Sequence, residues 1–141
     1  MTEARADIAC PAFANDTLSA RFAAFPVPQK AGLLALRSHI FALAGERFGP
    51  GRLVESLKWN QPAFNIIKPK RGTTLRMGAD EHGSISLFFT CTSGLVDRFR
   101  DLYGDELTFV GNRELQLGAN FLPNPAIDHC ILLALDPHCK G

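Results

Sequence analysis

The feature that most constrains the fold is a row of short strand patterns that follows one long helical pattern. The helix is predicted from Pro28 to Phe48, and its buried stripe is formed by Leu33, Leu36, Ile40, Leu43 and Ala44. Strand patterns then cover residues 53–59, 64–67, 73–77, 85–91, 107–110 and 113–117. Their short connections favour antiparallel pairing. The sequence therefore predicts an α+β domain, with helices packed on a mostly antiparallel sheet of five to six strands.

Three further helices are expected around this sheet. The first covers 17–25 with Asp16 as N-cap, and the second runs from Ser93, its N-cap, to Tyr103. Asn124 caps the last helix, whose predicted stripe is Ile127, Cys130, Ile131 and Ala134. The inner face predicted for the second helix is Leu95, Val96, Phe99, Leu102 and Tyr103. We expect residues 1–16 to be a flexible N-terminus and 17–141 to form a single domain.

Composition limits the classes of function. The 141 residues are 46% hydrophobic and 21% charged, which is typical of a globular domain. A net charge of +1 argues against a dedicated nucleic-acid binder. The chain has no apolar run of signal-peptide or membrane-span length, so we expect a cytoplasmic protein without a membrane partner. The four cysteines form no C-x-x-C, and we expect reduced thiols with Cys91 and Cys130 in the core.

The segment ESLKWNQPAF, Glu55 to Phe64, holds the only Trp of the chain. In a strand, Glu55 and Trp59 point to the same face as Leu53 and Leu57. We therefore predict that Trp59 is largely buried and structural. A carboxylate on an apolar face needs a partner or a wet pocket.

Three interpretations of Glu55 follow. It forms a bidentate ion pair with Arg113, which the strand pattern places on the face of Leu115 and Leu117. Alternatively, Glu55 acts as a catalytic residue. In the remaining interpretation a ligand pocket is lined by Glu55, Trp59, Pro62, Phe64 and Arg113.

An acidic cluster is the second candidate site. Asp97 and Asp101 share a helix face, and Asp105 and Glu106 follow directly. Carboxylates suit hard cations, iron included, whereas the interspersed Arg98 and Arg100 favour a self-neutralised surface. The chain has no metal-binding histidine spacing, no nucleophile motif and no phosphate-binding loop.

The pattern E-x-L-K-W-x-x-P-x-F at Glu55 to Phe64 resembles the YdhG-like family of small bacterial domains of unknown function. HGSISLFFTCTSGLVDRFRDLY, His82 to Tyr103, and GNRELQL, Gly111 to Leu117, are similar to its later strand and helix and to its closing strand. The resemblance covers roughly residues 17–136. It implies a compact α+β domain, and because some relatives are described as frataxin-like iron chaperones, it implies iron as a possible cofactor.

Together these patterns favour a non-catalytic cytoplasmic domain that binds a small molecule or a metal ion. One alternative is a module for protein interaction or self-association. The other is an enzyme that uses Glu55.

Overall fold

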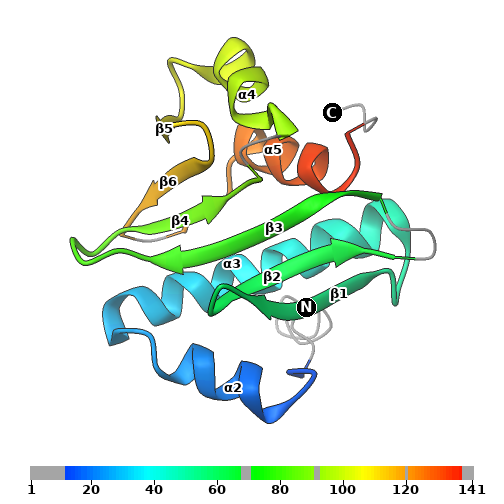
Figure 1. Ribbon diagram of the computed structural model, residues 1–141, viewed down its shortest axis with the longest axis vertical. Coiled ribbons are helices and arrows are strands. Elements are labelled where there is room, and N and C mark those ends of the chain that lie inside the picture. The colour runs from blue at the N-terminus through cyan, green and yellow to red at the C-terminus, as the bar shows by residue number, and fades with distance from the viewer. Residues whose placement is uncertain (1–11, 68–70, 91–92, 120, 138–141) are drawn as a thin grey trace, which may run out of the picture.

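A six-stranded antiparallel sheet forms the centre of the computed structural model, which describes residues 12–67, 71–90, 93–119 and 121–137 (Figure 1). The strand order is β1-β2-β3-β4-β6-β5. The strands are β1 (Leu53–Lys58), β2 (Gln61–Ile66), β3 (Arg71–Ala79), β4 (Ile85–Phe88), β5 (Thr108–Val110) and β6 (Glu114–Gly118). The predicted α+β class and the predicted number of strands are therefore confirmed.

In the described part of the chain, helices cover one face of this sheet. α3 (Val27–Phe48) and α5 (Pro125–Leu135) lie behind the strands in Figure 1, α2 (Asp16–Ala23) lies at the β1 side, and α4 (Leu95–Tyr103) packs on α5. The predicted stripe of α5 is buried, and Leu132, Leu133 and Leu135 are buried as well, since this helix contacts β3, α3 and α4. On α4 the predicted inner face is confirmed for Leu95, Val96 and Phe99, but Leu102 is exposed.

The helix starts show which capping predictions hold. Asn124 caps α5, and its Oδ1 accepts a hydrogen bond of 2.8 Å from the Ala126 N–H. The prediction of Asp16 as the first N-cap is wrong: Asn15 has the extended backbone, and its Oδ1 accepts from the Leu18 N–H at 2.9 Å. Asp16 instead lies in the first turn, where its charge complements the helix dipole.

The core lies between the covered face of the sheet and the two long helices. Alternation along the strands places Phe64, Leu75, Leu87 and Leu115 in it, all fully buried. Gly72, at φ 66°, passes so close to the end of α5 that a Cβ there would overlap the Ala134 and Leu135 carbonyl oxygens. None of the helices in the described ranges combines the length and the apolar character needed to cross a bilayer.

The other face of the sheet is polar, and Figure 1 looks onto it. Cross-strand hydrogen bonds join Asn65 Nδ2 to Thr74 Oγ1 at 3.0 Å and Ser86 Oγ to Glu114 Oε2 at 2.8 Å. We call this the open face, because the described helices all lie on the opposite side or at the edges of the sheet.

Candidate functional site

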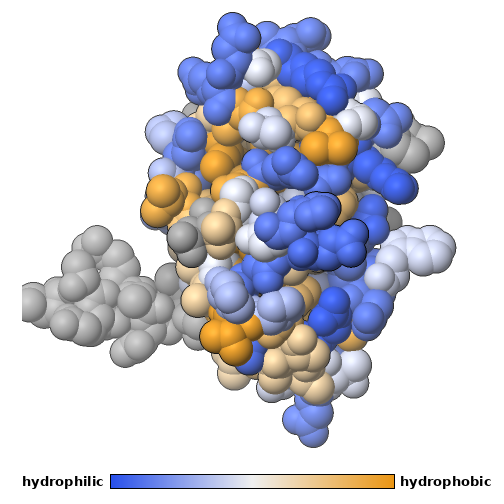
Figure 2. Space-filling view, turned by 90° about the vertical axis from the view of Figure 1, so that its left-hand side faces the viewer, coloured by the Kyte–Doolittle hydropathy of each residue, from blue (hydrophilic) through white to orange (hydrophobic). Residues whose placement is uncertain are grey.

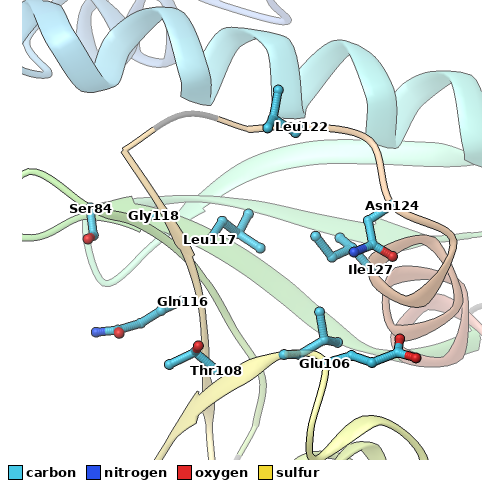
Figure 3. A pocket seen from close by; sticks show the side chains of 10 residues that line it. Ser84, Glu106, Thr108, Gln116, Leu117, Gly118, Leu122, Asn124 and Ile127 are labelled. Atoms are coloured by element: carbon cyan, nitrogen blue, oxygen red, sulfur yellow. The ribbon is translucent and has the colours of Figure 1, made fainter.

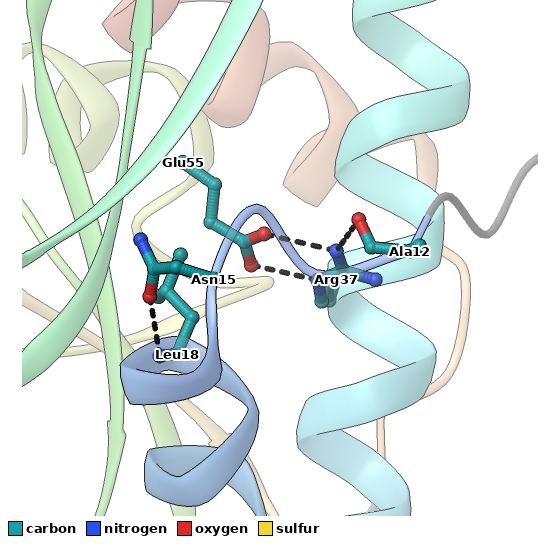
Figure 4. A network of polar contacts seen from close by, with 5 residues as sticks. All are labelled: Ala12, Asn15, Leu18, Arg37 and Glu55. Atoms are coloured by element: carbon teal, nitrogen blue, oxygen red, sulfur yellow. Dashed lines mark hydrogen bonds and ion pairs between the residues drawn. The ribbon is translucent and has the colours of Figure 1, made fainter.

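Glu55 forms a buried ion pair with Arg37 of α3 (Figure 4). Arg37 Nε donates to Oε2 at 2.6 Å and Nη2 donates to Oε1 at 2.9 Å, so the contact is bidentate. The two side chains are 1% and 3% exposed. The prediction of a Glu55–Arg113 bridge is therefore wrong, because both carboxylate oxygens are engaged by a residue of the covered face.

Aromatic rings complete the surroundings of this pair. The guanidinium carbon of Arg37 lies 4.2 Å from the centroid of the Phe13 ring and 5.0 Å from that of Phe41. Arg37 also donates to the Ala12 carbonyl at 3.3 Å. A substrate has no access to the Glu55 carboxylate in this arrangement, and the interpretation of Glu55 as a catalytic residue gains no geometric support.

The position of Arg37 in the sequence indicates that it is buried, although the predicted apolar stripe of the helix did not include it. Arg37 lies four residues after Leu33 and three before Ile40, so it falls inside the apolar stripe of α3. A charged residue there needs an opposite charge from the facing element. Glu55, the buried carboxylate of β1, is that charge.

Trp59 is exposed, contrary to the prediction of a buried structural residue. Its side chain and backbone together are 87% exposed. β1 ends at Lys58, which pairs with Gln61, so Trp59 and Asn60 form a two-residue hairpin turn. Both have positive φ, 54° and 61°, as a type I′ turn requires. Strand alternation therefore stops one residue before Trp59, and its side chain does not join the covered face.

The predicted five-residue pocket is not assembled. Phe64 is fully buried in the core, where its ring meets that of Phe41 edge to face at 6.0 Å between centroids. Pro62 is buried in β2, and Glu55 is held by Arg37. Of the predicted residues, only Trp59 and Arg113 line the same hollow, and this hollow lies on the open face.

Two adjoining hollows on the open face form the site that the structure does show. The larger, of about 420 Å³, is within the usual range of ligand pockets, and the smaller measures about 210 Å³. Trp59, Arg76 and Arg113 line both. We define the open-face site as Lys58, Trp59, Gln61, Thr74, Arg76, Phe88, Thr90 and Arg113.

Strand register positions these side chains. Arg76 of β3 is paired with Phe88 of β4, and the Arg76 guanidinium carbon lies 6.0 Å from the centroid of the Phe88 ring. Gly78 makes room beside them, because a Cβ there would lie 3.0 Å from Gln61 Nε2 and 3.3 Å from the Phe88 ring. Strand alternation signalled Arg76 and Phe88, since their neighbours Leu75, Met77, Leu87 and Phe89 are core residues.

Arg113 reaches the site from a turn. It directly precedes β6, and its carbonyl accepts a hydrogen bond of 2.7 Å from the Phe89 N–H. This bond holds the turn beside the end of β4. The predicted placement of Arg113 on the face of Leu115 and Leu117 is wrong, because the turn interrupts the alternation of β6.

The charges of the open-face site are unbalanced. Burial, and then the like charge of Arg113, lower the pKa of Arg76. Among the described residues, Arg76 donates one side-chain hydrogen bond, from Nη1 to Gln61 Oε1 at 3.0 Å, and Arg113 makes neither a side-chain hydrogen bond nor an ion pair. A guanidinium has five N–H donors, so most of the donors of this pair are available to a ligand.

Two other hollows lack a pair of arginines with available hydrogen-bond donors. One, of about 390 Å³, lies between the β5–β6 hairpin and the segment before α5, with Leu117, Leu122 and Ile127 in its wall (Figure 3). The surface on this side mixes hydrophilic and apolar residues, with apolar ones gathered in the upper half of Figure 2. Glu106 is the only charged residue that lines it among those described.

The second hollow, of about 450 Å³, lies beside α3 and α5. Four polar groups in or beside it are paired within the protein: Tyr103 Oη lies 2.6 Å from His129 Nδ1, and Asp128 Oδ1 lies 2.6 Å from His39 Nε2. Arg47, an exposed residue, is the single cation of its lining among the described residues. The contact with Asp128 and the Phe121 ring, 5.1 Å from the His39 ring between centroids, partly cover His39.

The acidic residues of the metal hypothesis are exposed. All four are at the surface: Asp97 lies in the first turn of α4, Asp101 in its last turn, and Asp105 and Glu106 just after the helix. Arg100 lies 3.7 Å from Asp97. In the described ranges, no three His, Cys, Asp or Glu side chains are grouped as a metal site would need. Iron binding stays a prediction. Cys130 is buried as expected, whereas Cys10, Cys91, Cys139 and His138 lie outside the described residues.

Comparison with known proteins gives no match. No family model matches the chain, and neither a curated protein nor a solved structure is significantly similar to it. The resemblance to the YdhG-like family therefore stays a prediction. What can be said of function rests on the geometry of the chain itself.

Proposed function

We propose that this protein is a non-catalytic binder of a small anionic molecule, which it holds at the open-face site. The observation that carries the proposal is the pair Arg76 and Arg113. Two guanidinium groups line the same hollow, and neither has a carboxylate partner in the described part of the chain. Mutual repulsion makes this arrangement unfavourable until an anion lies between them.

Arg76 is half-buried and Arg113 is exposed, so partial burial strengthens the attraction for an anion at Arg76 in particular. Charges at a protein surface interact more strongly when apolar walls replace part of the surrounding water. Phe88 and Trp59 supply such walls, and Gln61 fixes one nitrogen of Arg76. Arginine side chains held in this way bind carboxylate or phosphate oxygens in a bidentate manner.

The test is a thermal-shift screen of the purified protein against anionic and neutral metabolites, because any ligand of the folded state raises the melting temperature. Ligands that stabilise the wild type are then tested on Arg113→Met, Arg76→Met and Arg47→Met. Arg47 is an exposed arginine of α3, outside the open-face site, and serves as the control.

We expect anionic hits whose shift is lost in the first two variants and kept in the third. Hits that stabilise all three variants equally would place binding elsewhere. A screen in which only neutral compounds bind would contradict the proposal.

A further inference from the structure

We propose that the ligand of the open-face site is a planar aromatic ring joined to a phosphate or carboxylate, with the ring against Trp59 and the anion between Arg76 and Arg113. This inference rests on the proposed function and adds the ring to it. It is carried by the position and the backbone of Trp59, which the binding of an anion alone does not require.

The indole of Trp59 is presented to solvent at the mouth of the site. The chain has one Trp, and it is 87% exposed at the tip of the β1–β2 hairpin. An indole in water leaves a large apolar surface uncovered, whereas a planar ligand covers it. Phe88 lies in the same hollow and offers a second ring.

The backbone at Trp59 is unfavourable for this residue type. Type I′ turns prefer Asn or Gly at both central positions, because a positive φ brings the Cβ close to the backbone. Asn60 fits that preference, and Trp59, at φ 54°, does not. Strained residues of this kind are concentrated at binding and active sites, where the side chain is needed at that place.

Ring and anion belong to one molecule because the same residues line both hollows. Trp59, Arg76 and Arg113 are shared by the two. A group that contacts the arginines therefore lies beside the indole. Arg21 fixes this geometry from α2, since its Nε donates to the Asn60 carbonyl at 2.7 Å.

The experiment separates the two parts of the ligand. Calorimetric titrations compare adenosine 5′-monophosphate with adenosine, which lacks the anion, and ribose 5-phosphate, which lacks the ring. 1-Naphthoate is the carboxylate probe. Emission of Trp59 is a second readout, and it reports on the site alone because the chain has no other Trp.

We expect the nucleotide or 1-naphthoate to bind about tenfold or more tightly than either fragment. The stronger of the two identifies the phosphate or the carboxylate as the anion. Trp59→Leu keeps apolar bulk but loses the ring face, and it should reduce the affinity to that of the anionic fragment. Arg76→Lys keeps the charge but loses the planar fork, and we expect it to weaken binding about tenfold. Arg47→Met should leave the affinity unchanged.

Three results would overturn the inference. Ribose 5-phosphate that binds as tightly as the nucleotide, with no effect of Trp59→Leu, would leave the anion site standing without the ring. A short single-stranded oligonucleotide that binds more tightly than every small probe would make the ligand a nucleic acid. A wild type that binds neither these probes nor any anion in the thermal screen would remove the proposed function itself.

Discussion

The arginines on the two faces of the sheet differ in burial and in whether they have a carboxylate partner. On the covered face, Arg37 is 1% exposed and bonded through two nitrogens to Glu55. On the open face, Arg76 shares its hollow with a second cation, Arg113, and donates only to the neutral Gln61 among the described residues. Both guanidiniums lie near aromatic rings, so the difference is the carboxylate.

Solvent access explains why both arrangements persist. A charge removed from water must be paired, because the cost of leaving it alone is several kcal/mol. A half-buried charge is still partly solvated, and the fold tolerates it without a partner. The paired arginine is therefore part of the structure, whereas the arginines without a carboxylate remain able to bind one.

The largest expected effect concerns the buried pair. Glu55→Gln or Arg37→Met alone leaves an uncompensated buried group, and we expect each to lower the free energy of unfolding by about 3–5 kcal/mol. The double variant should lose less than the sum of the two. Urea denaturation of the four proteins measures the difference as a double-mutant cycle.

Glu55 and Arg113 supply the matched control for that cycle. Because Arg113 lies on the open face and does not contact the carboxylate, Glu55→Gln and Arg113→Met should be additive within about 0.5 kcal/mol. Coupling between Glu55 and Arg113, with additivity between Glu55 and Arg37, would reverse the assignment of the two arginines.

The second prediction tests the covered face through pH. Burial raises the pKa of the Cys130 thiol from 9.0 to about 12. Between these values the unfolded chain releases a proton that the folded protein keeps. The contribution of Cys130 to the free energy of unfolding is therefore fully present below about pH 9. It falls as the pH rises, by about 1.4 kcal/mol per pH unit.

Cys130→Ala removes that contribution. The other alkaline titrations are common to both proteins except that of Tyr103, whose pKa is raised first by burial and then by the charge of Cys130. Urea denaturation between about pH 8 and about pH 11 gives the free energy of unfolding of both proteins at each pH. We expect it to fall more steeply for the wild type, by up to about 1.4 kcal/mol per pH unit. Parallel curves would mean that the thiol is solvated in the folded state.

The sequence predicts the regular part of this molecule well and fails where strands end. The helix of residues 27–48 and the buried stripe of α5 follow from the 3.6-residue period, which holds along the whole helix. Trp59 and Arg113 were both placed by extending a period of two outside a strand: Trp59 follows the last residue of β1, and Arg113 precedes the first residue of β6. At each of them a turn begins or ends, and the side chain leaves the face that alternation assigns.

The same failure explains why the site was only half predicted. Trp59 and Arg113 were named as ligand residues, but on the wrong face and with Glu55 as their companion. Glu55 could not be assigned a partner from the strands alone, because Arg37 comes from a helix and the pairing depends on how α3 crosses β1. Gln61 and Phe88 lie in β2 and β4, and apart from strand alternation no sequence motif marks them as site residues.

The third prediction contrasts one aromatic residue from each face. Phe64→Ala removes a fully buried ring and should cost about 3–5 kcal/mol. Trp59→Ala removes an exposed ring and should cost less than about 1 kcal/mol, and Trp59→Asn should stabilise the protein by about 0.4–1 kcal/mol because Asn tolerates a positive φ. Equal losses for Phe64→Ala and Trp59→Ala in urea would show that the indole packs on the protein.

The smallest expected effect concerns the link between α2 and the hairpin. Arg21 donates to the Asn60 carbonyl at 2.7 Å, and its guanidinium carbon lies 4.2 Å from the centroid of the Phe25 ring. Arg21→Met keeps an apolar stem and removes the bond. Because the bond is exposed, we expect a loss of about 0.5–1 kcal/mol. The fluorescence anisotropy of Trp59 should fall, since the turn is then held by its backbone alone.

Arg98→Met is the control for this effect. Arg98 also donates one exposed side-chain bond to a carbonyl, that of Pro137 at 3.3 Å, but it lies on α4, outside the open-face site. If Arg98→Met causes a similar small loss of stability but leaves the Trp59 anisotropy unchanged, the bond from Arg21 of α2 is what restrains the hairpin turn. If both variants leave the anisotropy unchanged, the backbone of the turn alone restrains Trp59, and the bond from α2 is not needed for its position.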